Sequence, residues 1–479
     1  MSFTSISFII LFSTVCVLLL ALDRKCIRKH ICEHTQLQIK HLILLAASYV
    51  FYGWWDYRFC FLMALLSVIA WLSANMIAEN KHRKLFTVIG IVVPLIVLAF
   101  FKYFNFFIHS FAQAFNIQET STLNIILPVG ISFYTFQSMS YTIDVIRGNV
   151  RMHSLLEVSL YIAFFPQLVA GPIVKASDYM PQLQTYRPLR LQDFHDGIQI
   201  FLFGFIKKLV IADNLSVFVD DVFAKPLAFS SLTVILAVIS YSIQIYCDFS
   251  GYSDMAIGAA RCLGYDFRPN FNMPYISKNV TEFWKRWHIS LSGWLQEYLY
   301  IPLGGSRKGT ARRYINLMVT MILGGLWHGA DYTFVFWGLL HGCALCIHKM
   351  YMQWRKGRPS TVLSSIFSSV LTYVFVCICW VFFRSPNFQV ALDVLSKMFI
   401  WSDGITQIFS WSIISVVAVA LCTFWAYLRS KRENKSVTGG YYLILDLNTV
   451  KGLFFFFLAI MLAIALAYTN ANPFIYFQF

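Results

Sequence analysis

Charged residues are scarce in this sequence. Only 13% of its 479 residues are Asp, Glu, Lys or Arg, whereas 58% are hydrophobic and 18% are aromatic. A soluble domain carries about a quarter charged residues, so this composition excludes a soluble globular protein and predicts a polytopic membrane protein. Linker-like segments, low-complexity segments and evident internal repeats are also missing. We therefore expect a single membrane domain over 1–479.

The signatures of several other protein classes are missing as well. The eleven cysteines show neither metal-ligand spacing nor a paired framework, so we interpret them as small apolar residues. The H-E-x-x-H zinc motif and a Ser–His–Asp nucleophile motif are absent, and we expect no metal ion. The net charge of +15 does not indicate a nucleic-acid partner. Most Lys and Arg lie in short loops between apolar runs, where the positive-inside rule places them.

Long apolar runs are what the sequence does contain, and they predict an all-α membrane fold. We expect about 10–12 spans, with re-entrant or interfacial helices, around a central tunnel. The run 3–22 lacks the features of a cleaved signal peptide, so we interpret it as a retained span. The basic loop 23–40 predicts a cytoplasmic side, and alternation then puts both chain ends outside the cytoplasm. Other spans are expected near 41–55, 57–78, 85–107, 123–146, 314–328, 332–350, 364–384, 409–428 and 450–469.

Within the single domain we expect N-terminal spans over 1–150, a catalytic core over 155–350, and C-terminal spans and a tail over 364–479. The core contains helix-breaking residues in 155–174. Either this backbone is broken at membrane depth and buried in protein, or a helix simply ends in a surface loop. Both readings stay open.

Polar side chains interrupt the apolar run 232–263. Asp248, Ser250 and Asp254 lie within it. The two carboxylates could be helix-end caps. We favour a polar cavity wall, with Asp248 and Ser250 in contact with substrate, because carboxylates within a membrane segment usually serve function.

Two histidines dominate the stretch from Thr281 to Gly342. His288 lies in WKRWHISLS, where an apolar stripe at helical spacing predicts one continuous helix. The stripe consists of Trp284, Trp287, Leu291, Trp294 and Tyr298. His328 ends a nearly uncharged run. The basic loop around His288 predicts a re-entrant or interfacial helix rather than a full span.

A neutral imidazole can take a hydroxyl proton while an acyl group is attacked, and can return it to the leaving group. His328 and His288 are therefore candidate catalytic residues. The alternative for each is a structural hydrogen bond or packing role. We interpret His341 and His348, further along the chain, as structural.

Seven segments carry a resemblance to a known family. They are LPVGISFYTFQSMSYTIDVIRG (127–148), LVAGPIVKASDYMPQL (168–183), YCDFSGYSDMAIGAARCLGYDFRPNFNMPY (246–275), 281–306, LGGLWHG (323–329), WVFFRS (380–385) and PFIYFQF (473–479). Taken together and in this order along the chain, these segments resemble the membrane-bound O-acyltransferase family. The resemblance is to the bacterial branch that includes the membrane subunit of alginate O-acetyltransferase. The resemblance gives the catalytic role to His328 in the WHG motif and a second functional role to His288.

The resemblance implies an enzyme of the bacterial cytoplasmic membrane. It would move an acyl group, most simply acetyl, from a cytosolic thioester such as acetyl-coenzyme A to an extracellular or cell-wall polysaccharide. An extracytoplasmic SGNH-type acyltransferase is implied as its partner, beside the lipid bilayer. Two alternatives remain: D-alanyl transfer to teichoic acid, and a transporter, which would also place polar groups in broken helices.

The donor is expected to bind from the cytoplasm, beside aromatic and basic side chains. These are Trp284, Lys285, Arg286, Trp287, Arg307 and Lys308. The glycine-rich turn before Arg307 lacks the residue order of a P-loop. It is either a phosphate cradle or an ordinary positive-inside turn.

The C-terminal seven residues, PFIYFQF, are uncharged and aromatic. An interfacial aromatic belt is one interpretation. The ending also looks like the tyrosine-bearing tail of the small membrane partner in D-alanyl transfer. We therefore expect Tyr476, which carries the tail's side-chain hydroxyl, to accept the acyl group beside His328 and relay it outward.

Overall fold

The computed structural model of the chain describes residues 1–24, 30–117, 123–169, 171–355, 361–433, 445–468 and 474. Within these ranges every regular element is helical, and β pairing is limited to one isolated bridge. The predicted all-α class is confirmed. The chain divides into two compact units, 1–201 with 254–267, and 202–253 with 268–479. The single membrane domain and its internal boundaries stay a prediction.

Six helical stretches of the described chain are long and apolar enough to cross a membrane. They are Arg58–Ala78, Arg83–Ala114, Ser231–Cys262, Tyr332–Arg355, Val362–Arg384 and Ser410–Arg429. Two further apolar helices, Ile6–Leu22 and Val450–Leu466, are shorter. The chain is thus a polytopic membrane protein. The count of about 10–12 spans and the central tunnel stay predictions.

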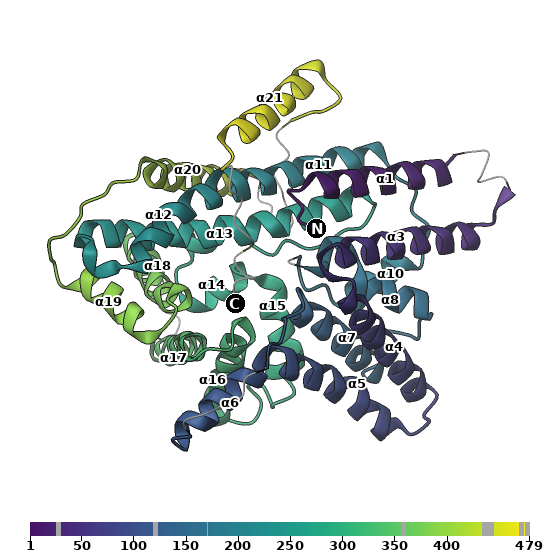
Figure 1. Cartoon of the computed structure of the whole chain (residues 1–479), viewed down its shortest axis with the longest axis horizontal. Helices are drawn as coiled ribbons and strands as arrows, with labels where there is room; N and C mark the ends of the chain where they lie inside the picture. The colour runs from purple at the N-terminus through teal and green to yellow at the C-terminus, as the bar shows by residue number, and fades with distance from the viewer. Residues whose placement is uncertain are drawn as a thin grey trace. The chain divides into compact units, whose positions relative to one another are not determined.

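The first unit contains the elements from α1 to α10. They are α1 (Ile6–Leu22), α3 (Glu33–Asp56), α4 (Arg58–Ala78), α5 (Arg83–Leu98), the π-helix η1 (Ala99–Tyr103), α6 (Phe104–Ala114), α7 (Ile131–Ile146), α8 (Leu155–Ala163), α9 (Phe165–Leu168) and α10 (Ala176–Leu183). Helices α4, α5 and α7 pack against one another (Figure 1). Helix α11 (Leu191–Ile206) begins in this unit and ends in the second.

Two predicted spans of the first unit need correction. The span expected at 123–146 is helical only from Ile131, and nearly all of that helix is buried in protein. The segment 155–174 contains α8 and α9 separated by Phe164, whose backbone leaves the helical region. The backbone is thus broken and buried in protein rather than ending in a surface loop, and its position at membrane depth stays a prediction. Side chains satisfy the freed groups: Ser48 accepts from the Phe165 N–H at 3.0 Å, and Tyr161 donates to the Val174 carbonyl at 3.0 Å.

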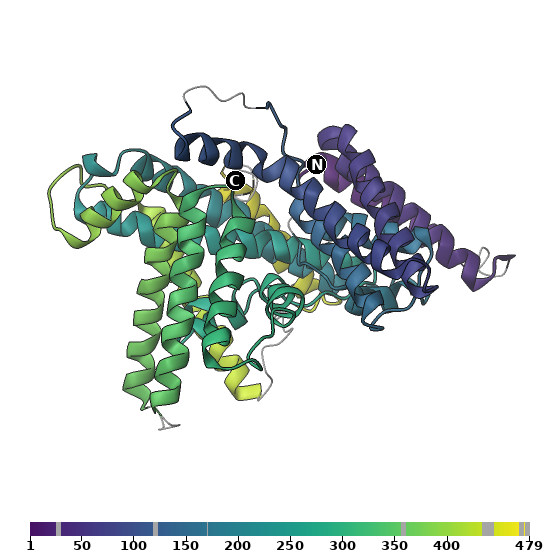
Figure 2. The ribbon, with the colours of Figure 1, turned by 90° about the horizontal axis from the view of Figure 1, so that it is seen from below.

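The second unit holds the elements that surround the two histidines. They are η2 (a π-helix, Lys207–Ala212), α12 (Asp213–Ala224), η3 (Pro226–Ala228), most of α13 (Ser231–Cys262), η4 (Pro274–Ile276), α14 (Val280–Arg286), α15 (Ile289–Leu295), η5 (a π-helix, Gln296–Tyr300), α16 (Thr310–His328), α17 (Tyr332–Arg355), α18 (Val362–Arg384), α19 (Phe388–Phe399), α20 (Ser410–Glu433) and α21 (Val450–Leu466). Helices α17 and α18 lie side by side in both views, and α16 packs on α17 (Figure 2).

The continuous helix predicted around His288 is wrong, because the helix breaks there. Helix α14 ends at Arg286, His288 adopts a left-handed conformation with φ of 44°, and α15 starts at Ile289. The interpretation that this element does not span the membrane is confirmed, since neither helix exceeds 7 residues. The stripe residues Trp287, Leu291 and Trp294 are nevertheless buried.

Backbone from an earlier segment causes the break. The Asn272 N–H donates to the Arg286 carbonyl at 2.8 Å, and that carbonyl would otherwise accept from Ser290 in a helix. The Ile289 N–H donates to the Asn270 carbonyl at 2.9 Å instead of continuing the helical ladder. The segment 270–272 therefore satisfies the groups that the break leaves open.

Glycines bring α16 and α17 into close contact. A Cβ added to Gly338 would lie 2.3 Å from the Met321 carbonyl oxygen, and one added to Gly325 would lie 2.2 Å from the Phe334 carbonyl oxygen. Both partners are backbone atoms, which cannot rotate away. The hairpin that ends α16 at His328 thus depends on residues without a side chain.

We predict that Gly338→Ala destabilises the protein by about 1–3 kcal/mol, because overpacking forces the two helices apart. The same substitution at Gly293, in α15, is the matched control, since nothing lies within 4 Å of an added Cβ there. Thermal unfolding of the purified protein in detergent measures both. Equal unfolding temperatures for the two variants would contradict this account of the hairpin.

Candidate active site

His288 lies at the start of α15, fully buried, with the Phe249 ring 4.5 Å from its own, centroid to centroid. A left-handed conformation costs a residue with a Cβ roughly 1–2 kcal/mol. Strain of this kind persists where surrounding structure holds it, and it is concentrated at functional sites. Burial lowers the pKa of His288 to about 3, so the ring is neutral at ordinary pH.

One amide side chain contacts His288 and its neighbours. Asn270 Oδ1 lies 3.3 Å from His288 Nδ1, and it accepts hydrogen bonds from the Ser290 N–H at 3.1 Å and the Ser290 hydroxyl at 2.9 Å. Asn270 Nδ2 donates to the Ser253 hydroxyl at 3.2 Å. Among the described residues, His288 Nε2 has no hydrogen-bond partner. Asn270 could not be found from the sequence, because it lies in an irregular segment outside any helix, and its contact with His288 arises only from the tertiary fold.

His328 ends α16 inside a cage of aromatic rings. Trp327, Trp337 and Phe383 lie 5.1, 5.1 and 5.3 Å from its ring, centroid to centroid. The His288 and His328 rings stand 6.5 Å apart. The structure therefore brings together the two histidines that the sequence singled out, 40 residues apart, in a buried and largely apolar setting.

The other histidines on α17 have partners that fit the predicted structural role. His341 is fully buried, and its Nδ1 accepts from the Trp284 indole N–H at 3.3 Å. The Trp337 ring lies 4.8 Å from it. His348 Nδ1 lies 2.8 Å from the Thr281 hydroxyl. Trp284, predicted to contact substrate, thus also connects α14 to α17.

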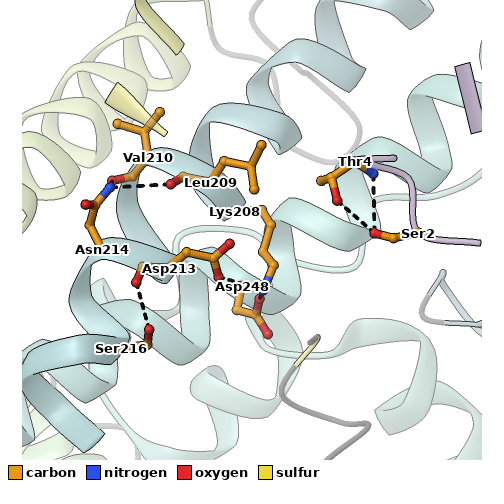
Figure 3. A network of polar contacts seen from close by, with 9 residues as sticks. All are labelled: Ser2, Thr4, Lys208, Leu209, Val210, Asp213, Asn214, Ser216 and Asp248. Carbon is orange, nitrogen blue, oxygen red and sulfur yellow. Dashed lines mark hydrogen bonds and ion pairs between the residues drawn. The ribbon is translucent and has the colours of Figure 1, made fainter. Parts of the chain in front are cut away.

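A buried ion network lies beside α13 (Figure 3). Lys208 Nζ lies 2.6 Å from Asp248 Oδ1 and 2.8 Å from Asp213 Oδ1, and each side chain is at most 4% exposed. Lys208 also lies over the Tyr252 ring. Asp248, predicted to be a cavity-wall residue, is therefore an ion-pair partner. Its role in substrate binding stays a prediction.

Three of the last described residues, Leu466, Tyr468 and Phe474, contact this same part of the unit. The Tyr468 N–H donates to the Leu209 carbonyl at 3.3 Å, and Asn214 donates to the Leu466 carbonyl at 3.1 Å. Phe474 is fully buried, 4.3 Å from the Tyr252 ring and 5.8 Å from the Phe249 ring, centroid to centroid. Tyr476 lies outside the described residues.

The remaining predicted site residues differ in how much of their surface is available. Lys285, Arg307 and Lys308 are exposed. The turn that carries the last two is tied to α16 by Asn316, which donates to the Leu303 and Gly305 carbonyls at 3.3 and 3.0 Å. Donor binding there stays a prediction.

Three other predicted site residues are paired with neighbouring groups or buried. Arg286 is paired with Glu282 at 3.0 Å and donates to the Asn272 carbonyl, which holds the break before His288. Trp287 is buried against Trp380. Ser250 is buried, and its hydroxyl has no hydrogen-bond partner in the part of the chain that the structure describes.

A helical membrane protein with two buried histidines among aromatic rings fits the class of membrane acyl-transfer enzymes. Comparison with known proteins identifies the family. The model of the membrane-bound O-acyltransferase family matches residues 51–388, a range that contains both histidines, and the chain belongs to that family. It is an acyltransferase.

Several relatives carry names that refer to acylation of a polymer. The chain is 43% identical over 370 residues to a protein of Pseudomonas aeruginosa named "Probable alginate O-acetylase AlgI", covering 75% of this chain and 70% of the relative. It is 37% identical over 387 residues to the peptidoglycan O-acetyltransferase of Helicobacter pylori, covering 74% and 73%. It is 28% identical over 281 residues to the teichoic acid D-alanyltransferase of Bacillus subtilis, covering 56% and 71%.

The ion network predicts that loss of Lys208 destabilises the protein more than loss of the Asp248 charge. Lys208→Met leaves two buried carboxylates without this cation and should destabilise the protein by about 3–5 kcal/mol. Asp248→Asn keeps the Lys208–Asp213 pair and should cost clearly less. Thermal unfolding in detergent measures both variants. A larger loss in Asp248→Asn would contradict the assignment of Lys208 as the shared partner.

Proposed function

We propose that this protein transfers an acetyl group from a cytosolic acyl thioester, acetyl-coenzyme A, across the bacterial cytoplasmic membrane for O-acylation of an extracellular or cell-wall polysaccharide. The observation that carries the proposal is the buried pair of His288 and His328, with rings 6.5 Å apart. The relatives named for O-acetylation support acetyl over D-alanyl, because they are 43% and 37% identical against 28%. An extracytoplasmic SGNH-type acyltransferase completes the transfer in this proposal.

The chemistry needs a base and little else from the protein. His328 takes the proton of the attacking hydroxyl as its oxygen bonds to the thioester carbon, and the proton then passes to the departing thiolate. A thiolate leaves readily, so strong activation of the leaving group is unnecessary. The aromatic rings around His328 exclude water, which limits loss of the acyl group by hydrolysis.

The donor approaches in this proposal from the cytoplasmic side, past the exposed Lys285, Arg307 and Lys308. Their positive charge suits the phosphates of a coenzyme. His288 is reached before His328.

We further propose that Tyr476 relays the acyl group. The support is Phe474, which lies only two residues before Tyr476 and is buried against Phe249, the α13 ring that also contacts His288. In the first step the phenol oxygen forms an ester with the acyl carbon, the thioester bond breaks, and the phenol proton reaches the thiolate through His328. In the second step an acceptor hydroxyl takes the acyl group and returns a proton to the phenol oxygen.

His328→Ala should lower polymer acetylation by about 10²–10⁴-fold, the usual contribution of a positioned general base. His348→Ala is the matched control and should retain activity, because that ring bonds only locally to Thr281 and is not part of the cage. Acetyl release from the isolated polymer, with protein amount and unfolding temperature checked for each variant, is the measurement. Near-normal acetylation in His328→Ala would remove the residue from the mechanism.

Tyr476→Phe keeps the ring and removes only the hydroxyl, so it should stop polymer acetylation without loss of protein. Intact-mass analysis of the wild type should find an acetylated C-terminal peptide, enriched when the extracytoplasmic partner is missing. Full activity in Tyr476→Phe would reduce the tail to an anchor and leave the role of His328 untouched.

A further inference from the structure

The hydrogen bonds around Asn270 determine which nitrogen of His288 carries the proton. The Ser290 backbone N–H can only donate, and it points to the Asn270 side chain at 3.1 Å. The contacting atom must therefore be the amide oxygen, and the amide nitrogen must be the atom that donates to Ser253 at 3.2 Å. The backbone N–H of Ser290 thereby determines which way the Asn270 amide is oriented.

An amide oxygen accepts and cannot donate. The Ser290 hydroxyl lies 3.5 Å from His288 Nδ1, but it donates to the same amide oxygen at the shorter distance of 2.9 Å. His288 Nδ1, 3.3 Å from that oxygen, therefore carries the hydrogen of this contact. A neutral imidazole has one N–H and one lone pair, so the lone pair lies on Nε2. That atom is buried and has no hydrogen-bond partner within the described chain. A buried acceptor without a donor carries a desolvation penalty that a bound group with a proton would remove.

We propose that Asn270 is a positioning residue that holds His288 in the Nδ1–H form, so that its Nε2 lone pair accepts the hydrogen bond of a hydroxyl bound between His288 and His328. The ring separation of 6.5 Å fits this arrangement. A ring nitrogen lies roughly 1.2 Å from its centroid, so the two nearest nitrogens are at least about 4 Å apart, beyond the ~3 Å of a direct hydrogen bond. One oxygen atom can bridge such a distance.

The expected effect of Asn270 on activity rests on the proposed acyl transfer. The expected tautomer of His288 does not depend on it. His288 and Asn270 then divide the work: Asn270 orients the ring, and the ring orients the hydroxyl whose proton His328 takes. The proton is not removed by both histidines. His288 contributes alignment and a hydrogen bond that strengthens as the oxygen attacks.

Two substitutions of Asn270 distinguish its proposed role in orienting the His288 ring from a role in structural stability alone. Asn270→Leu removes the acceptor, releases the ring from its fixed tautomer, and should lower kcat on the order of 10²-fold with little change in KM. Asn270→Asp keeps an oxygen for Ser290 and His288 and should restore most of kcat. The new carboxylate also favours the imidazolium and raises the pKa of His288, so the acid limb of the pH–rate profile should move to higher pH.

The groups around the ring bear on that profile. Helix α16 brings His328 to 6.5 Å from the ring, and α13 brings the uncharged Phe249 to 4.5 Å, centroid to centroid. These are the same in all variants, so a shift seen only in Asn270→Asp reports on His288. Gln167→Leu is the control for loss of a buried, hydrogen-bonded amide away from the site, and it should leave the profile unmoved.

Nitrogen-15 spectra of histidine-labelled protein in lipid, with His288→Gln to assign the signal, read the tautomer directly. Nδ1 protonated and Nε2 unprotonated in the wild type, with this state lost in Asn270→Leu, is the expected result. An Nε2–H wild type, or an unchanged tautomer in Asn270→Leu, overturns the proposal. So does a changed tautomer with unchanged kcat. In none of these cases is the loss of activity in His328→Ala affected, so failure of the inference and failure of the proposed function are distinguishable.

Discussion

A backbone group within a membrane protein must find a partner inside the protein, and the segment 270–272 provides partners where the helix at His288 breaks. Its N–H and C=O groups replace the helical bonds that Arg286 and Ile289 would have made. Without them the segment 280–300 would be expected to continue as one helix, as its apolar spacing favours. His288 would then turn with the helix face instead of being held at a chain reversal. The geometry of the site depends on this exchange of hydrogen bonds.

The positions of the histidines relative to their helices give them different electrostatic surroundings. His288 precedes α15, at the end where unpaired N–H groups disfavour a positive ring. His328 ends α16, where carbonyl groups favour a positive charge. These positions support the proposed division of roles, with hydrogen bonding at His288 and proton transfer at His328.

Hydropathy predicted the long helices well and the site geometry poorly. The apolar run at 232–263 is α13, Ser231–Cys262, and the span expected at 364–384 is α18, Val362–Arg384. Such segments are dictated by the bilayer, whose thickness acts on every residue of the run. The break at His288 and the pairing of Lys208 with Asp248 arise from contacts across 18 and 40 positions. No local pattern contains them, and the apolar stripe at Trp284 and Trp287 predicted the wrong continuation.

The π-helix η2 shows how a local irregularity joins the site to the chain end. Its wide turn leaves the Leu209 carbonyl available, and Tyr468 uses it, so the segment after α21 is anchored there. Lys208 in the same turn lies over Tyr252, whose ring packs on Phe474. Phe474 in turn contacts Phe249, the ring nearest His288. A buried cation, a π-helical turn and a row of aromatic contacts thus place Phe474 against the ring that packs on His288. An acyl relay on that tail requires this anchoring, because a covalent carrier is useful only if its hydroxyl returns to the same base in every cycle.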